Sequence, residues 1–152
     1  MTDDDLMALC MLQEAGGEPD DGKAAVCRVV RNRMARLYES DGTVKGTILR
    51  FDQFSWAWFD FVDGAYTRIA WDQIDAANVA AEKLSKAPMS ALAHCSVIAQ
   101  QVAGGTYHGP AYDNLTDDTV LYVAPALERK MPVWATPAKL VCTIGRQNFY
   151  RA

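Results

Sequence analysis

The chain has 152 residues, of which 50% are hydrophobic and 22% are charged, and this composition is typical of a soluble globular protein. The length predicts a single domain, residues 1–152, that buries enough apolar surface to fold without disulfides or metals. The net charge of -4 argues against a general nucleic-acid-binding protein and against electrostatic attachment to anionic membranes.

The first residues show neither the basic segment nor the apolar segment of a secretory signal peptide. No apolar run approaches the length of a membrane span. We therefore expect synthesis in the cytoplasm without a signal peptide, and no insertion into a membrane.

Four cysteines are spread widely along the chain: Cys10, Cys27, Cys95 and Cys142. The first three fall on apolar helical stretches. We expect structural thiols, because a free cysteine in such a stretch behaves as a small core residue. A disulfide remains an alternative if the protein works outside the cytosol. Neither His94 nor His108 stands at zinc-ligand spacing from a cysteine pair, so we expect no metal and no cofactor.

Two helices are predicted at the N-terminus, over residues 5–13 and 19–38. Thr2 and Asp5 have the spacing of a capping box before the first helix, and Pro19 suits the start of the second. The apolar face of the second helix follows helical spacing at Val26, Val29, Val30, Met34 and Leu37. Asn32 and Arg33 lie at the edge of this face, where surface residues are typical.

The junction of these two helices reads Glu14-Ala-Gly-Gly-Glu18. Glu14 would stand on the last turn of an apolar helix, where the helix dipole and partial burial both disfavour a carboxylate and raise its pKa. An acid that is still protonated near neutral pH can donate a proton to a leaving oxygen. The alternatives are a solvated helix-end glutamate for Glu14, and an N-cap or first-turn acid for Glu18.

The remaining sequence predicts three more helices, an aromatic loop and a small antiparallel β element near the C-terminus, which together give a mainly α, α+β fold. Thr43 caps the first of these helices, Ser90 caps the last, and Gly145 turns the final pair of strands. In chain order the predicted ranges are 44–49, 51–66 (the loop), 65–86, 91–103, 119–123, 139–143 and 148–151.

The aromatic loop between residues 51 and 66 contains seven rings. We expect at least half of them to fill the core between helices. The alternative is a saccharide platform, because the C–H face of a sugar ring stacks on aromatic side chains while its hydroxyls need polar partners. Gln53 and Ser55 supply such partners, and Trp56 and Trp58 are the rings that we expect to be exposed.

Several segments resemble the SleB-type cell wall hydrolases, the spore-cortex-lytic enzymes and their phage relatives. They occur in the family's order and span nearly the whole chain. These segments are Glu14-Ala-Gly-Gly-Glu18-Pro, Gly22-Lys-Ala-Ala-Val26, Val29-Val-Arg-Asn32-Arg33, Gly46-Thr-Ile-Leu, Gln53-Phe54-Ser55, Leu121-Tyr122, Pro132-Val-Trp134 and Ile144-Gly145-Arg-Gln-Asn-Phe149-Tyr150-Arg151.

The resemblance implies a lysozyme-like fold that cleaves the glycan strands of peptidoglycan, with Glu14 as the acid and the Asn32-Arg33 pair as residues that support the site. Candidate substrate-binding residues are Glu18, Gln53, Ser55, Trp56 and Tyr122. The chain departs from the family pattern at Leu121 and Val123, which are apolar, and at Gln147, where family members often carry a histidine.

A single acid suffices if the substrate supplies its own nucleophile, as in a lytic transglycosylase, and hydrolysis by water is the close alternative. Asp52 and Asp60 are candidates for a second carboxylate. The resemblance implies a monomeric phage-type endolysin released through a holin, or a lysin carried in a virion beside particle proteins. A module that has lost activity and binds glycan or protein is the non-enzymatic alternative.

Overall fold

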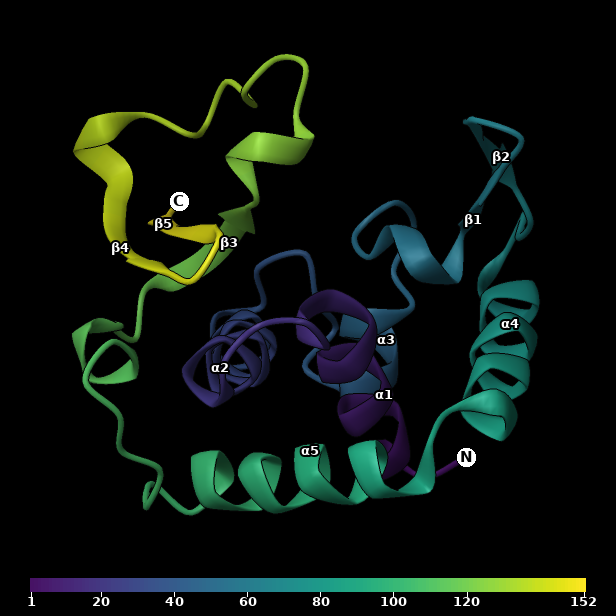
Figure 1. Ribbon diagram of the computed structural model, residues 1–152, viewed down its shortest axis with the longest axis horizontal. Coiled ribbons are helices and arrows are strands. Elements are labelled where there is room, and N and C mark those ends of the chain that lie inside the picture. Colours follow the sequence, from purple (N-terminus) through teal and green to yellow (C-terminus); the bar gives the residue numbers. More distant parts are fainter.

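The computed structural model describes residues 1–152 as a helical body that carries two small β elements (Figure 1). The buried α1 helix lies at the centre, with α2 and α3 beside it and α5 along one side. The β1–β2 hairpin and the β3–β5–β4 sheet lie on the side opposite α5. The element bounds are α1 Asp3–Ala15, α2 Asp20–Arg36, α3 Val44–Ile48, β1 Phe59–Val62, β2 Ala65–Arg68, α4 Gln73–Lys86, α5 Met89–Ala103, β3 Thr119–Val123, β4 Leu140–Ile144 and β5 Gln147–Arg151.

The α1 helix is buried on nearly all sides, as expected for a helix whose interior residues are mostly apolar. The predicted capping box is confirmed, because Thr2 Oγ1 accepts from the Asp5 amide and Asp5 Oδ2 accepts from the Thr2 amide, both at 3.1 Å. This cap satisfies two amides at the start of a helix that other elements surround. It fixes the end of α1 that lies away from Glu14.

The α2 helix buries the predicted stripe, with Val26, Val29 and Val30 inaccessible to solvent. The prediction for Leu37 was wrong. The helix ends at Arg36, and Leu37 takes a left-handed conformation (φ 53°) with its side chain exposed. Asn32 and Arg33 are buried rather than on the surface, because β3 and the turn before it cover that side of the helix.

The long helix predicted from residue 65 was wrong in its first part. Residues 65–68 form β2, which pairs antiparallel with β1. Asp63 and Gly64 both have positive φ, of 50° and 82°, which is the conformation of a two-residue hairpin turn. The helix proper starts at Gln73, with Asp72 accepting from the Asp75 amide as its N-cap.

The predicted C-terminal strands are confirmed, and β5 lies between β3 and β4. The two predicted helix caps have different outcomes. Thr43 caps α3 through the Gly46 amide as expected, but α5 begins at Met89 behind Pro88, so the predicted Ser90 cap was wrong. A second small core joins Val120, Leu121, Val123 and Tyr150 on the sheet.

The four cysteines are free, and Cys10, Cys27 and Cys95 are buried as expected. None of the helices combines the length and the apolar character that a membrane span requires. The helices α1 to α5 and the antiparallel β3–β5–β4 sheet confirm the predicted mainly helical α+β fold with a small antiparallel element.

Candidate active site

Glu14 lies on the last turn of α1, partly buried, at the point where α1 meets β3. Its Oε2 accepts a hydrogen bond of 2.8 Å from the Tyr122 hydroxyl. Burial raises the pKa of the Glu14 carboxyl above its ordinary value of 4.5, and this effect outweighs the opposing ones of the Tyr122 hydrogen bond and the nearby Arg33 charge. The carboxyl therefore holds its proton at higher pH than a solvated glutamate does.

Glu14 opens into a cleft of about 320 Å³ between the α1–α2 junction and the C-terminal sheet. Glu18 lines the same cleft. The lining residues are Leu12, Gln13, Glu14, Ala15, Gly16, Gly17, Glu18, Ala124, Ala126, Leu127, Arg146 and Gln147.

Tyr122 reaches Glu14 because α2 holds β3 in place. The buried Arg33 donates from Nε to the Val120 carbonyl at 2.7 Å, two residues before Tyr122. Its guanidinium also lies 5.3 Å from the centre of the Phe54 ring and donates from Nη1 to Gln53 Oε1 at 3.3 Å. Arg33 thus joins the aromatic segment to the strand that carries Tyr122.

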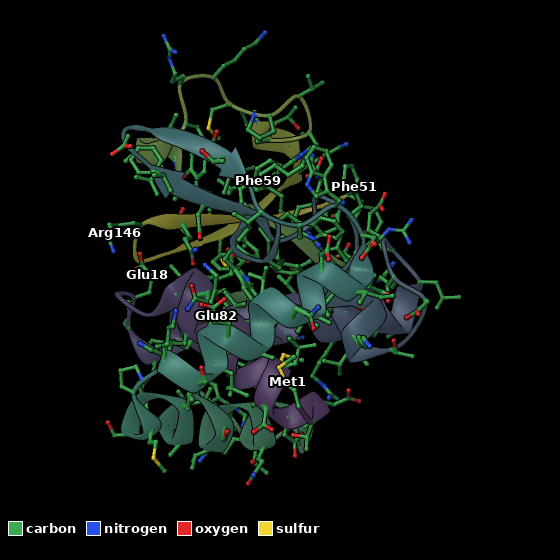
Figure 2. All side chains as sticks on the ribbon, turned by 90° about the vertical axis from the view of Figure 1, so that its right-hand side faces the viewer. Met1, Glu18, Phe51, Phe59, Glu82 and Arg146 are labelled. Carbon is green, nitrogen blue, oxygen red and sulfur yellow. The ribbon has the colours of Figure 1, made fainter.

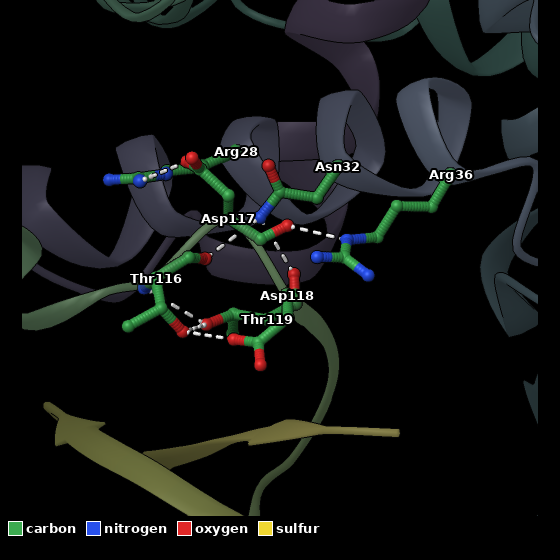
Figure 3. A network of polar contacts seen from close by, with 7 residues as sticks. All are labelled: Arg28, Asn32, Arg36, Thr116, Asp117, Asp118 and Thr119. Carbon is green, nitrogen blue, oxygen red and sulfur yellow. Dashed lines mark hydrogen bonds and ion pairs between the residues drawn. The ribbon is translucent and has the colours of Figure 1, made fainter.

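Asn32 supports the same strand from its other end (Figure 3). Its Nδ2 donates to the carbonyls of Thr116 and Thr119, at 3.1 and 2.9 Å. The flanking Arg28 and Arg36 bind the carboxylate and the carbonyl of Asp117, at 2.8 and 3.0 Å. Asn32 therefore anchors the turn before β3 to α2, and no hydrogen bond joins it to Glu14.

Gln147 binds the backbone of Glu14 rather than its side chain. Its Nε2 donates to the Glu14 carbonyl at 3.2 Å, and its side chain is buried where β5 begins. This bond satisfies one of the carbonyls that a helix end leaves without an intrahelical partner. Leu121 and Val123 point into the small core of the sheet, so the two apolar departures serve packing.

Glu18 is engaged on the cleft wall rather than at the start of α2. Its carboxylate accepts from Arg146, at 3.2 Å from the backbone amide and 2.9 Å from Nε. The N-cap position belongs to Pro19 and the first turn to Asp20 and Asp21, so the capping interpretation of Glu18 was wrong. Glu18 instead ties the helix junction to the turn between β4 and β5.

This tie predicts a specific effect at Gly145, whose φ is +57° and whose added Cβ would overlap Glu18 Oε2. We expect Gly145→Ala to lower the free energy of unfolding by about 2 kcal/mol, from left-handed strain and from displacement of Glu18. Gly64→Ala is the matched control, because Gly64 also has positive φ but open space around it. We expect it to cost about 1 kcal/mol, from strain alone. Urea unfolding compares the two, and equal losses would remove the Glu18 contact from the explanation.

The aromatic segment lies apart from the Glu14 cleft. Trp56 and Trp58 are buried, so the expectation that they are exposed was wrong, while Ser55 is exposed. Of this segment's predicted site residues, Gln53 is linked to the acid through Arg33 and β3. The two candidates for a second carboxylate also lie outside the Glu14 cleft. Asp52 Oδ1 is 3.9 Å from Arg68 Nη2, and Asp60 Oδ1 is 2.8 Å from Lys83 Nζ.

One cleft residue was not among the site candidates predicted from the sequence. Arg146 lines the cleft, and its side chain is 73% exposed. A signal was available, because Arg146 follows Gly145 within a segment of the family resemblance.

No protein-family model matches the sequence, and no curated protein matches it either. Two solved structures are similar over 98% of this chain. The catalytic domain of the germination-specific lytic transglycosylase SleB from Bacillus anthracis has 20% identity, a TM-score of 0.63 and 93% of its own chain covered. The catalytic domain of the Bacillus cereus SleB protein has 22% identity, a TM-score of 0.59 and 89% of its chain covered. This chain has the fold of the SleB catalytic domains. At these identities the similarity establishes the fold, and the chemistry must be argued from the site.

Proposed function

We propose that this protein cleaves peptidoglycan glycan strands between N-acetylmuramic acid (MurNAc) and N-acetylglucosamine (GlcNAc), as a lytic transglycosylase. The observation that carries the proposal is the state of the two carboxylates in the cleft. Glu14 has a raised pKa and faces the cleft, whereas Glu18 is bound by Arg146. One free acid without a second free carboxylate suits a substrate that supplies its own nucleophile.

Glu14 acts first as general acid and then as general base. In its protonated form it donates to the bridging oxygen, and the bond between that oxygen and C1 of MurNAc breaks. The C6 hydroxyl of the same MurNAc attacks C1, and the Glu14 carboxylate takes the hydroxyl proton. The products are a free GlcNAc hydroxyl and a 1,6-anhydro end, and Glu14 regains the proton that it began with.

Tyr122 is the group that balances these two roles. Its hydroxyl donates to Glu14 Oε2, and this bond favours the carboxylate that forms halfway through the reaction. Burial favours the acid that starts the reaction. Burial and this hydrogen bond therefore act in opposite directions on the pKa of Glu14, and burial has the larger effect.

A turbidity assay on purified cell walls, followed by mass spectrometry of the soluble fragments, tests the proposal. We expect clearing, with fragments that are one water lighter than reducing-end products. Fragments with reducing ends would assign hydrolysis by water instead. An absence of clearing with retained wall binding would assign the inactive glycan-binding alternative.

Tyr122→Phe gives a test through pH. Removal of the donor to the carboxylate raises the pKa of Glu14 further, so we expect the alkaline limb of kcat/KM to move to higher pH. The rate at the optimum should fall by less than about tenfold, since one hydrogen bond is lost and the acid remains. Tyr66→Phe removes the same hydroxyl from an exposed ring on β2 and should leave the profile unchanged. A limb that stays in place or moves to lower pH contradicts this role for Tyr122.

We further propose the setting of a phage-type lysin, made in the host cytoplasm and either released through a holin or carried in a virion. The resemblance of the chain to phage members of the family supports this setting. Expression in the cytoplasm of a bacterium, with and without a holin, tests it. Lysis only with the holin supports release from the cytoplasm, and lysis without a holin contradicts it.

A further inference from the structure

A second cleft of about 320 Å³ lies between α3 and the start of α4, and it shares no residue with the Glu14 cleft. Figure 2 shows Phe51, which lines it, at the opposite edge of the molecule from Glu18 and Arg146, with Phe59 between them. Its walls are formed by Asp41, Gly46, Leu49, Arg50, Phe51, Trp58, Trp71, Asp72 and Gln73.

Two large aromatic side chains of this cleft face solvent. Phe51 is 55% exposed and Trp71 is 76% exposed. The Arg68 guanidinium lies 5.1 Å from the Phe51 ring centre and 5.3 Å from the Trp71 ring centre. A cation held between rings fixes their positions, so a ligand that stacks on them loses little side-chain entropy.

Polar groups line the same cleft. The Asp41 carboxylate accepts from the Thr43 amide and hydroxyl, and the Asp72 carboxylate accepts from the Asp75 amide, so both are held in place. Gln73 adds a side-chain amide, and the buried Trp58 also belongs to the wall.

We propose that this cleft is a second glycan-binding site, which takes the N-acetylated sugars of the peptidoglycan strand. A pyranose presents an apolar C–H face to the rings and hydroxyls to the carboxylates, so it uses both kinds of wall. A nucleic acid would meet the Asp41 and Asp72 carboxylates with like charge. The assignment of the glycan to peptidoglycan rests on the proposed function.

A site away from the acid changes how the protein works on an insoluble polymer. It holds a neighbouring part of the wall while the Glu14 cleft exchanges one cleaved bond for the next. We therefore expect it to matter for intact walls and to be dispensable for short soluble fragments that fill the Glu14 cleft alone.

Co-sedimentation with purified cell walls tests the inference, using the full chain with Glu14→Gln so that the walls stay intact. Trp71→Ala in this background should weaken binding by about tenfold, and Trp71→Phe should restore most of it. Met89→Ala is the matched control, because Met89 is an exposed apolar side chain on α5, outside both clefts, and should have no effect. In the active protein, Trp71→Ala should slow clearing of walls but leave cleavage of short soluble glycans unchanged.

Wall binding by Trp71→Ala equal to that of the parent overturns the inference. So does a concentration-dependent dimer in size-exclusion chromatography that Trp71→Ala disrupts, because the face would then belong to a second copy. The proposed cleavage fails separately. A parent protein that binds walls through Trp71 but never cleaves them would keep this site and reject the reaction.

Discussion

Glu14→Gln is expected to lower the rate of wall clearing by about 10³-fold, within the range that general acid–base catalysis contributes. Glutamine has nearly the same shape and still offers an oxygen to the Tyr122 hydroxyl, but it has no proton to give to the bridging oxygen. Glu82→Gln is the matched control. It makes the same chemical change at an exposed position of α4, where Glu82 pairs with Lys86. It should keep full activity. Clearing at the parental rate by Glu14→Gln would remove Glu14 from the mechanism.

Glu14→Gln should also be more stable than the parent protein at neutral pH. The folded-state pKa of Glu14 lies above its ordinary value of 4.5, so its contribution to stability is fully present below pH 4.5 and is lost as the pH rises through the folded pKa. Above that point the parent buries a carboxylate and the variant buries a neutral amide. We expect a gain of about 1 kcal/mol at pH 7 that disappears at pH 4. Urea unfolding at both pH values measures it, and a loss of stability at pH 7 contradicts it.

This combination of lost activity and gained stability would distinguish a catalytic acid from a structural one. A carboxylate that holds the fold together makes its best contacts when charged, and its removal destabilises the protein. Glu14 instead carries a charge that burial disfavours, which is the arrangement of a site that gives up some stability for function. In the structure, the Tyr122 hydroxyl is the only group that donates a hydrogen bond to the Glu14 side chain.

The elements that could be predicted are those whose signal is local. The capping box at Thr2, the buried stripe of α2 and the turn at Gly145 each follow from residues a few positions apart. The hairpin at residues 59–68 was missed although its signal is local too. Asp63-Gly64 is a strong hairpin turn, but the alanine-rich sequence after it favoured a helix that was extended too far toward the N-terminus.

Other features depend on contacts between distant parts of the chain, which periodicity does not contain. Arg33 and Asn32 are buried because β3 and the turn before it, more than 80 residues further on, cover them and accept their hydrogen bonds. The contact of Tyr122 with Glu14 spans 108 residues, and only the family resemblance pointed to that tyrosine. Trp58 is buried while Trp71 is exposed, and the presence of an aromatic residue in the sequence does not predict which of the two is buried.

Arg33→Met is expected to show how strongly the acid depends on α2. The change removes a donor from the buried Val120 carbonyl and from Gln53, and it removes the cation from the Phe54 ring. An unsatisfied buried carbonyl costs about 1–3 kcal/mol, and a desolvated cation–π contact about 2 kcal/mol. Relief from burying the guanidinium offsets part of this loss. We expect a net loss of about 2 kcal/mol, or a melting temperature lower by about 4–8 °C.

The activity of Arg33→Met should fall as well, by less than about tenfold as in Tyr122→Phe, because β3 no longer holds the Tyr122 hydroxyl firmly against Glu14. Loss of the nearby positive charge also raises the pKa of Glu14, so the alkaline limb of the pH profile should move in the same direction as in Tyr122→Phe. Arg31→Met on the same helix is the matched control, since Arg31 is exposed, and it should change stability by less than about 0.5 kcal/mol. If Arg33→Met lowers stability but leaves the pH profile in place, Arg33 supports the fold without tuning the acid, and the link from α2 through β3 to Glu14 is mechanical alone.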